Sequence, residues 1–168
     1  MLNVALRFPA GLVLALLLLA VPALAETLSG RVVAIADGDT LTVLTERREQ
    51  VRVRLSDIDT PERGQPWGSR SRERLSELAF GQEVRVVVRD TDRYGRSVGR
   101  VWAGPVDVNA AMVRDGAAWV YRRYLKDASL LAIEDEARAA KRGLWGLPEA
   151  ERTPPWEWRA ERRSRAPQ

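Results

Sequence analysis

The chain is a succession of short strand-like segments, and this pattern limits its fold more than any other feature. Residues 51–55 alternate strictly between apolar and charged side chains, which is typical of a strand buried on one face. Four further segments, rich in Val, Leu and Ile and separated by turn residues, are predicted strands: 28–35, 41–44, 83–89 and 98–102. A helix is predicted over residues 67–80, between the third and fourth strands, and Gly81 ends it.

Two more helices are predicted after the fifth strand, over residues 108–114 and 127–142, with Asp127 as the N-cap of the second. Within the second helix, Glu134 is expected to pair with Arg138 at i+4. Five strands with a helix inserted between the third and fourth indicate a small closed barrel. We therefore expect an α+β fold, the five-stranded OB-fold with about three helices, which commonly binds oligonucleotides. A β-sandwich would need more strands. The domain is expected over residues 26–147, followed by a surface tail rich in Pro, Trp and Arg over 148–168.

The first 25 residues differ from the rest of the chain. Arg7 is their only charge, residues 11–21 are continuously apolar, and Ala23-Leu24-Ala25 is a small-x-small cleavage signal. We expect a secretory signal peptide that is cleaved after Ala25. The alternative is an uncleaved membrane anchor, for which the apolar run is short. The mature chain is then exported, to the periplasm or outside the cell, with no membrane attachment.

The sequence contains no His and no Cys. This excludes an imidazole general base, a thiolate nucleophile, a disulfide and a thiolate zinc site. A bound metal would need oxygen ligands, which favours a hard ion such as Ca²⁺ or Mg²⁺. Because Lys126 and Lys141 are the only lysines, 25 of the 27 basic residues are arginines. Arginine suits phosphate oxygens, although a general preference for Arg codons would give the same composition.

Two acidic motifs are candidates for a cation site. Asp37-Gly38-Asp39-Thr40 is good hairpin chemistry, but a turn does not need the second acid, Asp39. Asp57-Ile58-Asp59-Thr60-Pro61-Glu62 carries three carboxylates in six residues. Asp39, Asp59 and the Thr60 carbonyl could bind a hard cation, and Glu62 could hold a water molecule. The alternative is two solvated turns.

Arginines and tyrosines near these motifs fit a phosphate and a base. Arg54 lies on the polar face of the third predicted strand, and Arg96 lies in a turn after Tyr94. Two such arginines could hold a phosphate between them, whereas each alone could be a surface cation. Tyr121 and Tyr124 enclose two arginines, a pattern that suits base stacking beside a charged backbone. Core packing is the alternative for these aromatic residues.

Taken in order, the motifs resemble those of the staphylococcal nuclease (thermonuclease) family. The resemblance is carried by Asp37-Gly38-Asp39-Thr40, by Arg54 five residues before Asp59-Thr60-Pro61-Glu62, and by Asp92-Arg93-Tyr94-Gly95-Arg96. Val108-Asn109 and Gly143-Leu144-Trp145 also match, so the similarity runs from about residue 28 to 145. In two places the chain departs from the family: residues 63–66 are shorter than the founding member's basic loop, and the tail lies outside the family pattern.

The resemblance implies an OB-fold nuclease that uses one Ca²⁺, with Asp39, Asp59 and the Thr60 carbonyl as ligands. It also implies that Arg54 and Arg96 contact the scissile phosphate, that Glu62 lies at the attacking water, and that the products carry 3′-phosphate ends. Tyr94 and one of the two other tyrosines, Tyr121 or Tyr124, resemble the residues that line the family's nucleotide site.

Further expectations follow from the chemistry. A water nucleophile needs no 2′-hydroxyl, so both DNA and RNA are expected substrates. Contacts to phosphate carry little sequence information, and stacking on tyrosine favours single-stranded or frayed nucleic acid. A monomer is expected because the sequence has no long heptad pattern.

Two other functions fit parts of the sequence. The first is a non-catalytic OB-fold module that binds nucleic acid. The second is an exported module that binds a protein or an envelope polyanion through its arginine-rich tail.

Overall fold

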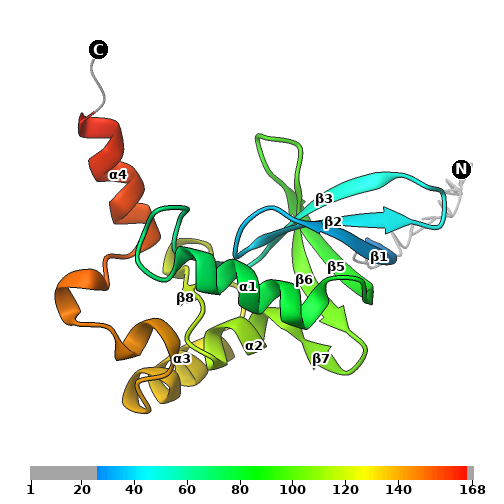
Figure 1. Ribbon diagram of the computed structural model, residues 1–168. Coiled ribbons are helices and arrows are strands. Elements are labelled where there is room, and N and C mark those ends of the chain that lie inside the picture. Colours follow the sequence, from blue (N-terminus) through cyan, green and yellow to red (C-terminus); the bar gives the residue numbers. More distant parts are fainter. Residues whose placement is uncertain (1–25, 166–168) are drawn as a thin grey trace, which may run out of the picture.

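The computed structural model describes residues 26–165, so the predicted signal peptide, residues 1–25, lies outside the described residues (Figure 1). The five expected strands are confirmed, and they are β1 (Thr27–Ile35), β2 (Thr40–Thr45), β3 (Gln50–Leu55), β5 (Glu83–Thr91) and β6 (Ser97–Ala103). The sheet order is β3-β2-β1-β5-β6-β7, and a parallel pairing of β3 with β6 closes the sheet into a barrel. The predicted α+β barrel, consistent with an OB-fold, is therefore present.

The three predicted helices are also present, as α1 (Gly68–Ala79), α2 (Val108–Arg114) and α3 (Ser129–Ala139). Helix α3 is shorter than predicted, and its N-cap is Ala128 instead of Asp127. The Asp127 carboxylate still accepts the Ser129 N–H at 3.0 Å, so it satisfies a free donor from one residue before the cap. No helix among residues 26–165 combines the length and the apolar content that crossing a membrane requires.

Several short elements were not expected from the sequence. They are β4 (Ile58–Asp59), β7 (Val106–Asp107), β8 (Trp119–Val120), the 3₁₀ turns η1 (Arg122–Tyr124), η2 (Gly143–Gly146) and η3 (Glu149–Glu151), and the helix α4 (Pro155–Arg165). Strands β4 and β8 pair with each other in a separate two-stranded sheet. Helix α4 gives the C-terminal segment a defined structure, and its later turns project from the body of the molecule (Figure 1).

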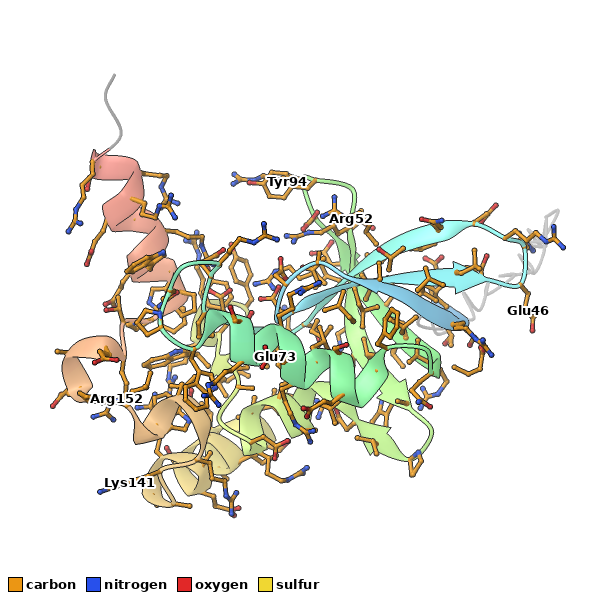
Figure 2. All side chains as sticks on the ribbon, in the orientation of Figure 1. Glu46, Arg52, Glu73, Tyr94, Lys141 and Arg152 are labelled. Atoms are coloured by element: carbon orange, nitrogen blue, oxygen red, sulfur yellow. The ribbon has the colours of Figure 1, made fainter. Side chains whose placement is uncertain are left out.

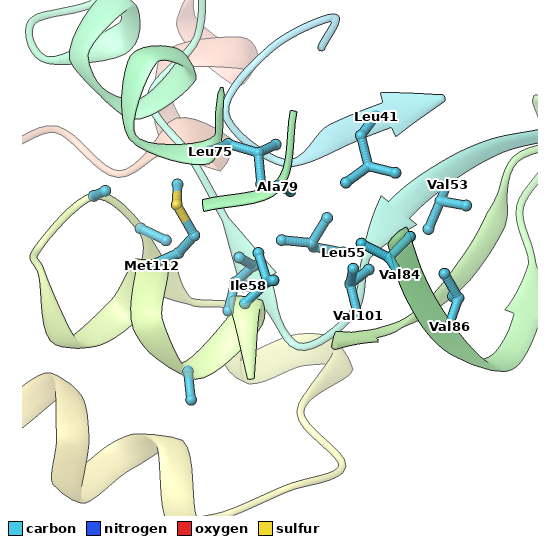
Figure 3. Packing of buried hydrophobic residues seen from close by; sticks show 14 of the residues in the cluster. Leu41, Val53, Leu55, Ile58, Leu75, Ala79, Val84, Val86, Val101 and Met112 are labelled. Carbon is cyan, nitrogen blue, oxygen red and sulfur yellow. The ribbon is translucent and has the colours of Figure 1, made fainter. Parts of the chain in front are cut away.

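The main core fills the barrel and the space beneath α1 and α2 (Figure 3). Leu41, Val53 and Leu55 come from the barrel strands, Leu75 from α1 and Met112 from α2, and all are almost completely buried. Burial of each large apolar side chain stabilises the folded state by about 1.5–3 kcal/mol. As the alternation predicts, the apolar side chains of β3 face this core.

A second, aromatic cluster fixes the C-terminal segment to the domain. Trp119, Ala137, Leu144 and Trp145 are buried in it, and Trp156 of α4 packs against it. The ring centroids of Trp119 and Trp156 are 5.9 Å apart, and those of Tyr121 and Trp156 are 5.3 Å apart in a parallel stack. The first turn of α4 is therefore anchored by aromatic contacts.

Glu134 of α3 is a fully buried carboxylate that holds this region together. Its Oε1 accepts the Val120 N–H at 2.9 Å, and its Oε2 lies 2.8 Å from Arg122. Arg138, the i+4 partner predicted from the sequence, lies 3.4 Å from Glu134 Oε2. The carboxylate thus joins α3 to strand β8.

Replacing Glu134 by Ala should lower the free energy of unfolding by about 3 kcal/mol, because it leaves a buried N–H and a partly buried guanidinium without their acceptor. Chemical denaturation at neutral pH measures this change. Glu136→Ala, on the exposed side of the same helix, is the control and should change the free energy of unfolding by less than about 0.5 kcal/mol. An equal, small effect of both substitutions would contradict this account of Glu134.

Candidate active site

Three strand ends meet where the sequence motifs lie. Asp39 immediately precedes β2, and the next residue, Thr40, is paired with Arg54 on the neighbouring strand β3. Arg54 is also paired with Val98 across the parallel β3–β6 contact. Arg96 precedes β6 by one residue, so barrel closure brings it to the same place. The barrel thereby brings together Asp39, Arg54 and Arg96 at one of its ends, although up to 57 positions separate them in the sequence.

Asp59 and Thr60 reach this place from the short strand β4, in which Asp59 is paired with Trp119 of β8. Gly38 allows the turn before β2 to pass close to them, since a Cβ atom there would lie 2.7 Å from the Thr60 hydroxyl oxygen. The Thr60 N–H donates to Asp39 Oδ2 at 3.3 Å. The two acidic motifs of the sequence are therefore in direct contact.

A single guanidinium joins the two buried aspartates. Arg54 Nη1 lies 2.6 Å from Asp39 Oδ2, and Arg54 Nη2 lies 3.0 Å from Asp59 Oδ1. The side chains of Arg54, Asp39 and Asp59 are only 16%, 9% and 1% exposed. Arg54 is therefore no ordinary solvent-facing arginine, whereas Arg52, two residues earlier on the same strand, is exposed (Figure 2).

The electrostatics of these groups reflect burial and mutual contact. Burial raises the pKa of Asp39, but the Arg54 guanidinium outweighs it and leaves that pKa below its ordinary value. Burial raises the pKa of Asp59, and the neighbouring Asp39 charge adds to the increase. Burial and the Asp39 charge also raise the pKa of Asp37 to about 6. Negative charge is thus concentrated at this point, and the region would accommodate additional positive charge.

Arg96 lies on the Asp39 side of the site. Its Nε donates to Asp92 Oδ2 at 2.7 Å, and its Nη1 donates to the Thr40 hydroxyl at 3.2 Å. That hydroxyl in turn donates to Asp39 Oδ1 at 3.1 Å. Tyr94 stands at the tip of the β5–β6 hairpin, largely exposed, with the Arg96 guanidinium 5.5 Å from its ring centroid (Figure 2). Arg96 and Tyr94 thus occupy one rim of the site.

The opposite side contains a residue that the motifs did not predict. Arg159 of α4 places Nη1 at 2.6 Å from Glu62 Oε1 and Nη2 at 2.6 Å from Asp59 Oδ2. It comes from the segment expected to be a surface tail. The high Trp and Arg content of that segment indicates that it could have a role, but composition does not identify which residue acts. No spacing rule connects Arg159 to carboxylates about 100 positions earlier.

Asp57, the remaining carboxylate of the second acidic motif, serves a different purpose. Its side chain is fully buried and accepts hydrogen bonds from the Ser56 hydroxyl at 2.7 Å and from Arg89 Nη1 at 2.8 Å. It also accepts the N–H of Asp127, at 3.3 Å. These contacts tie the turn before β4 to the segment that leads into α3, so Asp57 has a structural role.

Tyr121 and Tyr124 lie together beside α4. Their ring centroids are 4.8 Å apart, and Trp156 stacks on Tyr121. Tyr121 and Trp156, with Arg122 and Arg123, line a hollow of about 240 Å³. A second hollow of about 420 Å³ has a different lining, made of Glu62, Arg63, Trp158, Arg159, Arg162 and Arg163. Tyr121 therefore contacts α4, the helix that carries Arg159, whereas the hollow beside Glu62 is lined by other residues.

The oxygen atoms gathered at this place are of the kind that a hard cation prefers. Among residues 26–165, no group of three acidic side chains is arranged as a ready metal site, so a cation here would need backbone or water oxygens as well. Asp39 and Asp59 already converge on one positive group, the Arg54 guanidinium, and the Thr60 backbone touches Asp39. Two carboxylates with a neighbouring carbonyl and water are a suitable donor set for Ca²⁺.

Comparison with known proteins agrees with this geometry. Residues 52–146 match the model of the family described as staphylococcal nuclease homologues. The chain is 48% identical over 155 residues to a protein of Shigella flexneri named micrococcal nuclease. That alignment covers 85% of this chain and 86% of the Shigella protein. The chain is also 45% identical over 139 residues to an uncharacterized endonuclease of Escherichia coli O157:H7, covering 82% of this chain and 89% of that protein. The chain therefore belongs to the staphylococcal nuclease family, which confirms both the predicted family and the predicted class of enzyme, a nuclease.

Proposed function

We propose that this nuclease is exported, depends on calcium, and hydrolyses phosphodiester bonds of DNA and RNA with little sequence specificity, leaving 3′-phosphate ends. The observation that carries the proposal is the pair of buried aspartates bridged by Arg54, with Arg96 on one side and Glu62 on the other. These carboxylates and arginines supply the charges that phosphodiester hydrolysis needs. The reaction can therefore proceed without histidine or cysteine.

Asp39, Asp59 and the Thr60 carbonyl would hold the cation. A bound Ca²⁺ supplies positive charge that stabilises the negative charge developing on the phosphate in the transition state. Once the two carboxylates are neutralised in this way, Arg54 no longer has to compensate both of them. Its fork can then donate to a phosphate oxygen, and Arg96 can do the same from the other side.

Glu62 orients the attacking water molecule or accepts a proton from it. A bond forms between the water oxygen and phosphorus as the P–O5′ bond breaks, which gives a 3′-phosphate and a 5′-hydroxyl. No 2′-hydroxyl takes part, so this chemistry applies to DNA and RNA alike. Tyr94 and the Tyr121–Tyr124 pair provide faces on which unpaired bases can stack, which supports a preference for single-stranded or frayed substrate.

Export is supported by the three-part pattern of residues 1–25. Cleavage after Ala25 would release a chain that begins at Glu26, which acts as a monomer. N-terminal sequencing of the protein recovered outside the cytoplasm of a bacterial host should therefore read Glu26 first. Recovery of the uncleaved chain from the membrane fraction would contradict this part of the proposal.

The proposed activity is tested by incubating the purified mature chain with single-stranded DNA, in the presence of calcium or of a chelator. Calcium-dependent degradation to fragments with 3′-phosphate ends is expected. Binding without degradation would instead favour the non-catalytic OB-fold module. Neither binding nor degradation would favour a module that binds other partners through its arginine-rich end.

Replacing Arg54 or Arg96 by Ala should lower the turnover number by about 10²–10³-fold, because each removes a donor to the charge that develops on the phosphate. Steady-state kinetics with calcium measures the effect. Arg54→Lys keeps a positive charge between the aspartates and tests whether lost folding explains the loss of activity. Arg52→Ala, on the same strand but exposed, is the matched control and should retain the normal rate. Full activity of either Ala variant would refute its role as a phosphate ligand.

Replacing Asp39 by Ala should abolish the response of the activity to calcium, because one of the two carboxylate ligands is removed. A calcium titration of the hydrolysis rate, together with calorimetric titration of the ion alone, measures the change. Asp90→Asn, an exposed acidic residue of β5, serves as the control for a change in net charge. An unaltered calcium titration of the Asp39→Ala variant would refute the assignment of Asp39 as a ligand.

A further inference from the structure

The C-terminal helix α4 contributes a side chain to the active site. Arg159 spans the Glu62 carboxylate and the Asp59 carboxylate with the two Nη atoms of one guanidinium, at 2.6 Å to each. A guanidinium is planar and rigid, so two carboxylates held on one fork are also held at a fixed separation from each other. The contact thus links the proposed water-orienting residue to a proposed ligand of the cation.

Within residues 26–165, Arg159 is the only partner of the Glu62 side chain. That side chain is 38% exposed and stands on the loop between β4 and α1. A glutamate without a partner samples several rotamers, and fixing it costs conformational free energy. Arg159 therefore supplies the contact that selects one position for the Glu62 carboxylate.

The backbone of Glu62 is held from the same C-terminal segment. Its N–H donates to the side-chain oxygen of Gln65 at 3.0 Å, and the buried Gln65 amide donates in turn to the carbonyl of Thr153. Trp156, one turn before Arg159, packs on Trp119 and stacks on Tyr121. The loop is thus fastened to the residues just before α4, and the first turn of α4 is fastened to Trp119 and Tyr121.

Arg159 and a cation do not exclude each other on grounds of charge. Asp39, Asp59 and Glu62 carry three negative charges, and Arg54 with Arg159 returns two positive ones. A divalent cation and one phosphodiester group would bring the assembly to neutrality with both arginines in place. Asp59 Oδ1 accepts from Arg54 at 3.0 Å and from Arg159 Nη1 at 3.2 Å, which uses both of its lone pairs. Asp59 Oδ2 accepts only from Arg159 Nη2, at 2.6 Å, so its second lone pair can still face a cation.

We propose that Arg159 is a positioning residue of the active site, which fixes the Glu62 carboxylate beside Asp59 so that the attacking water is held in line with the phosphate. This inference rests on the proposed role of Glu62 in hydrolysis. It also gives the segment after residue 146, where the match to the family model ends, a part in the reaction.

The test is a double-mutant cycle in the full mature chain, with wild type, Arg159→Ala, Glu62→Gln and the combination. With calcium and single-stranded DNA, Arg159→Ala should lower kcat by about 10–100-fold and leave KM within about twofold. In the Glu62→Gln background the same substitution should lower kcat by less than about threefold, because residues that act as a unit are not additive. Arg159→Lys should restore part of the lost kcat.

Two measurements do not depend on activity. In chelator, Arg159→Ala should lower Tm more in the wild-type chain than in the Glu62→Gln chain, because the pairing with Glu62 is lost only in the former. Calorimetric titration should give a calcium affinity within about threefold of wild type. Arg165→Ala, in the exposed last turn of the same helix, should change neither kcat nor Tm.

Three outcomes would overturn the inference. Additive losses of kcat would mean that Arg159 acts without Glu62, and an unchanged kcat would reduce the contact to an ion pair with no catalytic effect. Faster hydrolysis with tighter calcium binding would make Arg159 a competitor of the cation. If the wild-type chain hydrolyses nothing, the proposed function fails, while the coupling of Tm in chelator still reports whether Arg159 fixes Glu62.

Discussion

Two carboxylates buried side by side need compensating positive charge, and much of the site depends on how this chain provides it. Asp39 and Asp59 are almost inaccessible to water and share the fork of Arg54. Leaving either carboxylate buried without that partner would cost several kcal/mol. Arg54 can serve both because the pairing of β2 with β3 places it beside Asp39, and the pairing of β3 with β6 adds Arg96. Closure of the barrel therefore brings Arg54 and Arg96 to Asp39, whereas Asp59 reaches them from the separate β4–β8 pair.

The same constraint explains how a folded, stable arrangement can become a reactive one. Arg54 and Arg159 compensate the carboxylates in the present structure. In the proposed mechanism, a divalent cation would take over the part of Arg54 at Asp39 and Asp59, and the Arg54 guanidinium would then be available to a phosphate. Chemistry of this kind uses only carboxylates, arginines and water, which agrees with a chain that contains neither histidine nor cysteine.

Local patterns were sufficient to predict most of the framework. The strict alternation around Arg54 gave a strand with this residue on its polar face, and the i+4 spacing of Glu134 and Arg138 gave a contact that the structure contains. Alternation could not show that, on the polar face of β3, the Arg54 side chain is largely buried while the Arg52 side chain is exposed to solvent. That difference arises from the parallel contact with β6, which joins distant parts of the sequence.

Other features lay beyond sequence reasoning for identifiable physical reasons. Asp57 and Asp59 stand two positions apart in one acidic motif, yet one binds Arg89 and the other Arg54. The backbone reverses between them, with a positive φ of 66° at Asp57, and no composition rule specifies which carboxylate then faces the site. The contribution of Arg159 requires α4 to dock through Trp156, an aromatic contact between segments far apart in the chain.

A crystal structure of the mature chain with calcium and a non-hydrolysable nucleotide would show how the buried aspartates and the arginines are used. We expect one ion bound by Asp39, Asp59 and the Thr60 carbonyl, with a phosphate oxygen on both Arg54 and Arg96. We also expect that the guanidinium of Arg159 remains on Glu62. A phosphate bound away from these arginines, or an ion bound without the two aspartates, would contradict the proposed mechanism.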